Sequence, residues 1–405
     1  MPIRALKILH TADFHLGSPY RFLPMAKQKQ IQAEAERSFY GMVDLASREK
    51  VDFITVAGDL FDSVRPDVAL FDRVKQALSS LGNLPVIINP GNHDYWHEDG
   101  FWQELDSLDN VYILQPDKIC QPFPDYDLAF WGKAFTSQSS DRPLWQIKDE
   151  AYFNEHKAEY NILLEHGDIL NRQSNYNPIS LSWIDQMGFQ LALLGHIHNP
   201  EGPAYSRQGV LCLYNGCCPG RGFDELGEKG VHLLEIADLR QAKQAKINFV
   251  PLDGPRFYRL NFNMSALDSD FSTQIYEEIS RKVLADFGHV PAKFDSCQLL
   301  CQGSYGQNLN FDLLYQKLQE HFFYLEIKDE TRLRIDQQVL LSEHSLRGDV
   351  SRYAKQLATR PDLLNRVLEE VGLSDLDMKT AKEVIDQAYY FTMQAADRDL
   401  DIYED

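Results

Sequence analysis

Five short motifs in this sequence combine aspartate, asparagine and histidine in patterns that suit metal binding. Each follows a run of apolar residues that predicts a β-strand, and glycine precedes several of the polar residues, where a tight turn brings backbone close to a ligand. The motifs are Asp13-Phe14-His15, Gly58-Asp59-Leu60-Phe61-Asp62, Gly91-Asn92-His93-Asp94, His166-Gly167-Asp168 and Gly195-His196-Ile197-His198. Carboxylate, carboxamide and imidazole groups bind divalent ions such as Mn, Fe or Zn. The set therefore predicts a divalent-metal centre.

Each motif taken alone has an ordinary explanation. Gly-Asp and Gly-Asn are common turn dipeptides, and a single Asp-x-His is more often structural than metal-binding. The joint occurrence of all five at strand ends is hard to obtain by chance. Asp13 and His15 would project to the same side of an extended segment, as would His196 and His198, so each pair is expected to converge on one centre.

The strands that carry these motifs alternate with helical patterns. We expect strands at 6–10, 52–56 and 84–89, with helices at 26–50 and 68–81 between them. This βαβαβ order places the polar residues at the carboxyl ends of the strands, where open α/β sheets bind ligands. Later strands, expected at 160–164, 191–194, 210–214 and 231–236, have fewer intervening helices and predict a second sheet. The expected fold is a two-sheet α/β sandwich flanked by helices.

A cluster of proline and glycine at 251–255 predicts a domain boundary. A smaller pattern of alternating strands and helices follows it, and beyond about residue 337 the sequence becomes helical and charged, with an acidic end at 397–405. We expect a catalytic domain over 1–253, an α/β domain over 254–335 and a helical C-terminal segment over 336–405.

The composition is that of a soluble globular protein, with 44% hydrophobic and 25% charged residues in 405. No apolar run is long enough to cross a membrane, and the N-terminus is typical of a first strand, not of a signal peptide, so we expect a cytoplasmic protein. The six cysteines are too scattered for a disulfide framework. A net charge of −20 opposes unaided DNA binding, although bound cations reverse the local field at a phosphate site. A partner is therefore expected to contribute affinity.

The five motifs resemble those of the calcineurin-like metallophosphoesterase superfamily, D-x-H, G-D-x-x-D, G-N-H-D/E, H and G-H-x-H, over the first 250 residues. The resemblance implies two divalent ions, Mn first with Fe or Zn as alternatives, which together stabilise the attacking and leaving oxygens at phosphorus. It divides seven ligands between the two ions, with one carboxylate bridging them: Asp13, His15 and His198; Asn92, His166 and His196; and Asp59 as the bridge.

The same resemblance gives two further residues a part in catalysis. It makes His93 the general acid, or the group that stabilises the charge of the leaving alkoxide. It makes Asp62 the carboxylate that orients His93. A helix cap or a solvated surface residue is the alternative for Asp62.

Finer features resemble the DNA-repair nuclease branch of this superfamily, bacterial SbcD and YhaO-type exonucleases. They are the segments 10–17, 58–62 and 214–230, together with an α/β unit like the capping domain of these nucleases. Asp62 agrees with the bacterial members, whereas Cys217 stands where relatives often carry Ser or Asn. The resemblance implies a DNA exonuclease of 3′ to 5′ polarity, with endonuclease activity as an option, acting in double-strand-break repair.

Members of this branch work with an ABC-type or AAA-like coiled-coil ATPase, which contacts their C-terminal helices, and they often form homodimers. Here the C-terminal helices serve either that contact or packing on their own core. Arg221, Tyr95 and Trp96 are candidate substrate contacts, Arg221 for phosphate and the two aromatic residues for stacking on an unpaired base. Two other functions stay open: hydrolysis of small phosphodiesters or nucleotides, and a non-catalytic structural subunit of a repair complex.

Overall fold

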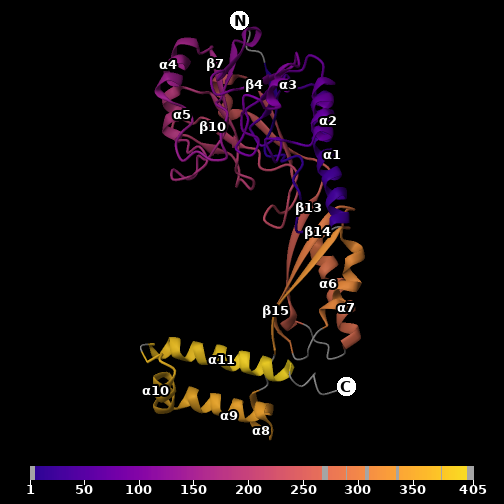
Figure 1. Ribbon diagram of the computed structural model, residues 1–405, viewed down its shortest axis with the longest axis vertical. Helices are drawn as coiled ribbons and strands as arrows, with labels where there is room; N and C mark the ends of the chain where they lie inside the picture. The colour runs from indigo at the N-terminus through magenta and orange to yellow at the C-terminus, as the bar shows by residue number, and fades with distance from the viewer. Residues whose placement is uncertain are drawn as a thin grey trace. The chain divides into compact units, whose positions relative to one another are not determined.

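The computed structural model describes residues 5–266, 272–288, 290–305, 310–333, 337–374 and 376–398 (Figure 1). They form two compact units. The first comprises the described parts of Met1–Leu260, Asp286–Gln298 and Leu318–Glu326, and the second those of Asn261–Ala285, Leu299–Lys317 and Ile327–Asp405. Residues 399–405 of the expected acidic end lie outside the described residues.

The first sheet has six strands. In spatial order they are β12 (Lys246–Pro251), β11 (Gly230–Ile236), β1 (Leu6–Thr11), β2 (Phe53–Val56), β3 (Val86–Ile88) and β4 (Val111–Ile113). The strands from β1 to β4 are parallel, and the crossovers between them carry the helices α1 (Met25–Glu49), α2 (Val68–Ser79) and α3 (Trp102–Asp106). The βαβαβ prediction is confirmed.

The second sheet also has six strands. In spatial order they are β5 (Cys120–Phe123), β6 (Leu128–Trp131), β7 (Tyr160–His166), β8 (Leu191–Gly195), β10 (Leu211–Tyr214) and β9 (Ala204–Tyr205). Strands β6, β7, β8 and β10 are parallel, with α4 (Ile147–His156) and α5 (Leu181–Met187) in their crossovers. A second sheet was correctly predicted.

One strand joins a different sheet from the one expected. β11, expected in the second sheet, pairs antiparallel with β1 in the first, with Leu234 opposite Ile8. Its apolar residues face both ways: Val231 packs beneath the helices of the first sheet and Leu234 lies between the sheets. A strand that is apolar on both faces carries no sequence signal of which sheet it joins.

Three apolar layers hold the sandwich together. One lies between the first sheet and helices α1 and α2, and includes Phe39 and Ile54. The middle layer lies between the two sheets, where the rings of Phe53 and Phe130 meet edge to face with centroids 5.2 Å apart. The third lies under α4 and α5, and Phe153 is fully buried there. Burying each such side chain stabilises the fold by roughly 1.5–3 kcal/mol.

The remaining elements confirm the predicted order of strands and helices. A three-stranded sheet has the order β13 (Arg256–Asn263), β14 (Asp295–Tyr305), β15 (Tyr324–Leu333), and its connections carry α6 (Ser272–Phe287) and α7 (Phe311–Leu318). The helices α8 (Gln337–Ser342), α9 (Leu346–Thr359), α10 (Pro361–Glu370) and α11 (Met378–Arg398) follow. Within the described ranges, no helix combines the length and hydropathy that a membrane span requires.

Candidate metal centre

The five motifs lie where β1, β2, β3, β7 and β8 end, and tight turns bring them together. At this edge the two sheets approach so closely that a methyl group on Gly195 would overlap the carbonyl oxygen of Ala57. Hydrogen bonds tie neighbouring turns to each other: Asp13 N donates to Gly58 O at 3.0 Å and His15 N to Asp59 O at 2.9 Å. The carboxyl ends of the two sheets thus form one continuous polar edge.

The backbone of these turns is left-handed, contrary to the extended conformation expected. Asp13, His15, Asp59 and His196 have φ values of 53°, 46°, 50° and 97°. Strand alternation therefore does not explain how these side chains converge, and that part of the prediction is wrong. Left-handed residues other than glycine cost about 1 kcal/mol or more each and cluster at functional sites, where the surrounding structure enforces them.

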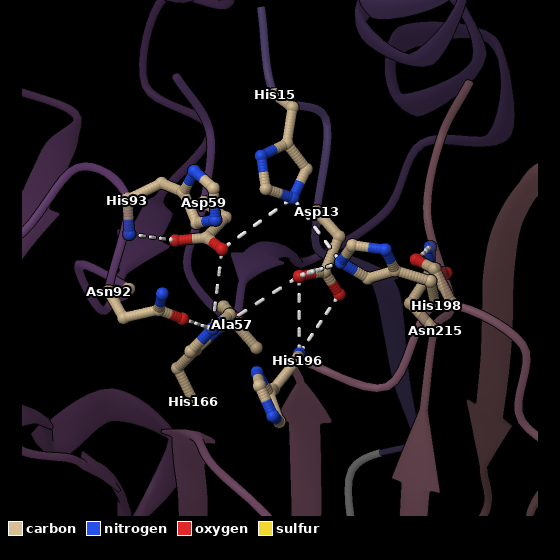
Figure 2. Close-up of polar contacts among 12 residues, drawn as sticks. Asp13, His15, Ala57, Asp59, Asn92, His93, His166, His196, His198 and Asn215 are labelled. Atoms are coloured by element: carbon tan, nitrogen blue, oxygen red, sulfur yellow. Dashed lines mark hydrogen bonds and ion pairs between the residues drawn. The ribbon is translucent and has the colours of Figure 1, made fainter. Parts of the chain in front are cut away.

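Asp13, His15 and His198 converge on one point (Figure 2). The Nε2 atoms of His15 and His198 lie 3.3 Å apart, and His198 Nε2 lies 3.6 Å from Asp13 Oδ1. Asp13 is fully buried and His15 nearly so. The three residues assigned to one ion by resemblance are therefore grouped in the structure.

Asp59 lies between this group and a second one. Its Oδ2 is 3.5 Å from His15 Nε2 and 3.4 Å from His166 Nε2, on opposite sides of the carboxylate (Figure 2). Asn92 Oδ1 approaches His166 Nε2 to 3.0 Å. The predicted bridging position of Asp59 thus agrees with where its side chain lies.

His196 is placed differently from the other six. Its backbone N–H donates to Asp13 Oδ2 at 3.0 Å, and Figure 2 shows this contact through the backbone. Among the described residues, none of the candidate ligand clusters of aspartate and histidine includes its ring. The ring lies 5.3 Å from that of His166 and 4.7 Å from that of Tyr176, centroid to centroid. Ligation by His196 stays a prediction.

The orientation of the imidazoles fits divalent cations. His15 Nδ1 donates to Asp62 at 3.1 Å, and His166 Nδ1 donates to the carbonyl oxygen of Ala57 at 2.8 Å. With a proton on Nδ1, each ring turns the lone pair of Nε2 toward Asp59. Buried lone pairs and carboxylate oxygens that face one another without a donor between them repel unless a cation lies among them. The donor set of imidazole nitrogens and carboxylate oxygens is one that Mn, Fe and Zn accept.

Without ions, the acid–base properties of the centre are perturbed. Burial, together with the neighbouring charge of Asp13, raises the pKa of Asp59 to about 7. Burial opposes protonation of His198, but hydrogen bonds to Asp13 and Glu225 outweigh it and raise the pKa of His198 to about 10. Bound divalent cations would favour the deprotonated form of both groups.

Residues 6–200 match the calcineurin-like phosphoesterase family. This part of the chain belongs to that family. Membership implies metal-dependent hydrolysis of phosphoesters, in agreement with the donor set.

Three curated relatives extend the match beyond this domain. The metallophosphoesterase YhaO of Bacillus subtilis, itself described as uncharacterized, is 28% identical over 250 residues, 58% of this chain and 58% of YhaO. A protein of the nuclease SbcCD from Staphylococcus epidermidis is 24% identical over 310 residues, 70% of this chain and 78% of the relative. The corresponding SbcCD protein of Staphylococcus saprophyticus is 23% identical over 327 residues, covering 71% and 78%. The chain thus spans well under two thirds of the length of YhaO.

The phosphoesterase centre has a supporting shell that the sequence indicated only in part. Asp62 was predicted to orient His93, but its Oδ1 lies closer to His15 Nδ1, at 3.1 Å, than to His93 Nδ1, at 3.6 Å. Glu225, to which we gave no role, lies 2.7 Å from His198 Nδ1. Its position four residues after Arg221, within the segment that resembles the nuclease branch, was the only available signal.

A second overlooked carboxylate, Asp94, fastens two turns of the phosphoesterase centre. It is completely buried and accepts hydrogen bonds from the backbone N–H groups of Gly91 at 2.8 Å and Phe61 at 3.0 Å. These bonds join the turn after β2 to the turn after β3, and so fix Asp59 relative to Asn92. The G-N-H-D motif contained this residue, but sequence alone did not separate a structural carboxylate from a ligand.

The remaining candidates lie on the open side of the centre. The side chain of His93 is 43% exposed, and its backbone N–H donates to Asp59 Oδ1 at 2.8 Å. Tyr95 is half-buried and lines a cavity of about 610 Å³. Trp96 packs against the core beneath the first sheet. The guanidinium of Arg221 is directed inward, to Glu225 and Asp62. Substrate contact by Tyr95, Trp96 or Arg221 stays a prediction.

Proposed function

We propose that the chain is a two-metal phosphodiesterase that hydrolyses DNA, as an exonuclease of 3′ to 5′ polarity. The observation that carries the proposal is the placement of Asp59. Its carboxylate lies between two groups of buried ligand-type side chains, and its second oxygen accepts the backbone N–H of the exposed His93. A buried pair of cation positions beside an exposed imidazole is an arrangement suited to phosphoryl transfer.

Asp13, His15 and His198 would hold one ion, Asn92, His166 and His196 the other, with Asp59 shared. The ions would supply Lewis-acid stabilisation of the phosphoryl oxygens and lower the pKa of water. The residues of the chain do the rest. The turn after β3 presents His93 to solvent at the edge of the centre, where it can give a proton to the departing alkoxide. Asp62, within 3.6 Å of His93 Nδ1, stabilises the protonated ring.

Two features support DNA as the substrate. The match to the SbcCD nuclease proteins covers about 70% of the chain, well beyond residues 6–200, so it includes elements that follow the phosphoesterase domain. The net charge of −20 opposes tight DNA binding by the chain alone, which fits a subunit whose partner contributes DNA affinity. We infer that a coiled-coil ATPase is this partner and that the helices from α8 to α11 receive it, in a cytoplasmic double-strand-break repair complex.

The test is degradation of linear double-stranded DNA by the purified chain with Mn²⁺, with Fe²⁺ and Zn²⁺ compared. Substrates labelled at either the 3′ or the 5′ end report polarity, and a circular single strand reports endonuclease cleavage. Asn92→Ala and His93→Ala are expected to abolish cutting, whereas His156→Ala, an exposed histidine on α4, should cut normally. Absence of cutting by the unaltered chain, with and without a coiled-coil ATPase, would reject the nuclease proposal.

The acidic surface favours a second candidate, hydrolysis of small phosphodiesters or nucleotides, since such substrates need no extended basic surface. Hydrolysis of bis-p-nitrophenyl phosphate separates the two. Turnover of the small ester far above that of DNA would support the second candidate. A chain that binds metal but hydrolyses neither would support a structural subunit.

A further inference from the structure

The two groups of candidate ligands at the phosphoesterase centre are supported in chemically different ways. His166, on one side of Asp59, donates from Nδ1 to a backbone carbonyl, that of Ala57. On the other side, His15 and His198 direct Nδ1 to side-chain carboxylates, those of Asp62 and Glu225. Backbone support is fixed by the fold, whereas carboxylate support adds negative charge to the imidazole and depends on where those side chains are held.

Arg221 holds the two supporting carboxylates in one network. Its Nη2 donates to Glu225 Oε1 at 2.8 Å, its backbone N–H to Glu225 Oε2 at 2.7 Å, and its Nη1 lies 3.4 Å from Asp62 Oδ1. Glu225 is nearly inaccessible to solvent, with 3% exposed. A buried carboxylate with these partners remains ionised: burial would raise its pKa, but the hydrogen bonds from His198 and Arg221 outweigh burial and lower the pKa of Glu225.

The contacts of His198 Nδ1 identify Glu225 as its acceptor. Arg221 Nη2 also lies near this nitrogen, at 3.0 Å, but Nδ1 cannot both donate to the carboxylate and accept from the guanidinium. The carboxylate contact is shorter, at 2.7 Å, and the guanidinium has Glu225 as its own acceptor. The proton therefore lies on Nδ1, and Nε2 is left to face Asp13.

The loop that carries Glu225 is anchored independently of the centre. Gly227 N donates to Phe257 O at 2.8 Å, and Arg259 Nη2 donates to Phe223 O at 2.8 Å. The Phe223 ring packs edge to face on that of Phe257, with centroids 5.4 Å apart. Glu225 is thus held from both sides of the loop before any ion binds, which is the preorganisation that a supporting residue needs.

We propose that Glu225 is a positioning residue for one metal ion only, the ion that His198 would bind. The inference rests on the proposed two-metal centre and adds an asymmetry to it. Replacing a carboxylate that supports a ligating histidine typically weakens metal binding 10- to 100-fold. The ion on the His166 side should keep its affinity, because its imidazole is supported by backbone.

The experiment is calorimetric titration of the metal-freed full chain with Mn²⁺, which resolves the two binding steps. The unaltered chain is expected to bind two ions. Glu225→Gln should weaken one step about 10- to 100-fold and leave the other within about threefold. Glu228→Gln, the same substitution at an exposed residue of the same loop, should leave both steps unchanged. Raising the Mn²⁺ concentration should restore activity to Glu225→Gln, because the variant has lost affinity and not a catalytic group.

Three outcomes are decisive. Two unchanged steps in Glu225→Gln, or equal weakening of both, would overturn the inference, because a general structural role affects both positions. Fewer than two ions bound by the unaltered chain would instead overturn the two-metal proposal, and the inference with it. If Glu225→Gln does not fold, Arg221→Lys replaces it: the lysine keeps the charge but cannot reach both carboxylates, so the same single step should weaken.

Discussion

The most exacting prediction from this structure concerns a single methyl group at Gly58. Gly58 precedes Asp59 with a φ of +88°, and a Cβ added there would lie 2.7 Å from Cγ of His166 and 2.8 Å from Cα of Gly91, and closer still to His166 Nδ1. Gly58→Ala therefore imposes two separate costs. One is the strain of a left-handed alanine, and the other is displacement of the imidazole that would bind metal.

The magnitudes can be separated with a matched control. A left-handed non-glycine residue costs about 1–2 kcal/mol. Overpacking in a close-packed site adds about 1–3 kcal/mol. Gly188, at the C-terminal end of α5, has a similar φ of +81° but nothing within 4 Å of an added Cβ. Gly188→Ala should therefore show the conformational cost alone, and Gly58→Ala about 2–5 kcal/mol in total.

Urea unfolding followed by tryptophan fluorescence measures both variants. All five tryptophans lie between Trp96 and Trp183, so the signal reports the first unit without interference from the helices beyond residue 337. Mn²⁺ titration of the same samples should show weakened binding in Gly58→Ala and normal binding in Gly188→Ala. Equal destabilisation of the two variants, with equal metal affinity, would refute the packing that we assign to this edge.

Three further predictions concern the centre, and one concerns the core. Asp94→Ala should lower the free energy of unfolding by about 2–5 kcal/mol, because buried backbone N–H groups lose their acceptor, and Asp94→Asn should lose less; equal stability by urea unfolding would contradict this role. His93→Gln should lower turnover about 10²- to 10⁴-fold while both Mn²⁺ ions still bind, and retained turnover would exclude proton donation by this residue. Since the pKa of Asp59 is raised to about 7 and that of His198 to about 10, and both bind metal only when deprotonated, Mn²⁺ affinity should fall as the pH is lowered through 7. Titration in buffers of different ionisation enthalpy should detect the released protons, and their absence would count against ligation by these groups. Phe53→Ala should cost about 3–5 kcal/mol, because the ring is fully buried between the sheets, and a loss below about 1 kcal/mol would contradict that packing.

Much of the fold was predictable because its signals are local. The crossover helix at 26–50 and the strand at 52–56 follow from hydrophobic periodicity within a few residues, and the structure places them at Met25–Glu49 and Phe53–Val56. The polar motifs at strand ends indicated where the centre would form. The sheet joined by β11 was not predictable, because it depends on pairing between Leu234 and Ile8, residues more than half the chain apart.

The supporting shell was harder to predict than the ligands. Ligand-type residues belong to compact motifs, whereas Glu225 reaches His198 from a loop 27 positions later and shows no distinctive spacing. Arg221 was chosen as a phosphate contact on its charge and position alone. In the structure its guanidinium bonds to neighbouring carboxylates, because a partly buried cation is stabilised by the nearest anions. The direction of a long side chain depends on three-dimensional neighbours that sequence does not disclose.

The left-handed turns were missed for a related reason. Asp13 and His15 follow a strand, and the simplest continuation is an extended one, which would also have put both side chains on one face. The backbone N–H groups of both residues instead bond to the turn after β2, and φ becomes positive. Long-range hydrogen bonds override the local preference at this edge.

The central claim is that two divalent ions lie on either side of Asp59. The most direct measurement is X-ray diffraction from crystals of the Mn²⁺-loaded chain, collected at the manganese absorption edge. We expect two anomalous peaks, one beside Asp13, His15 and His198 and one beside Asn92 and His166, with the carboxylate of Asp59 between them. A single peak, or peaks away from this carboxylate, would contradict the claim.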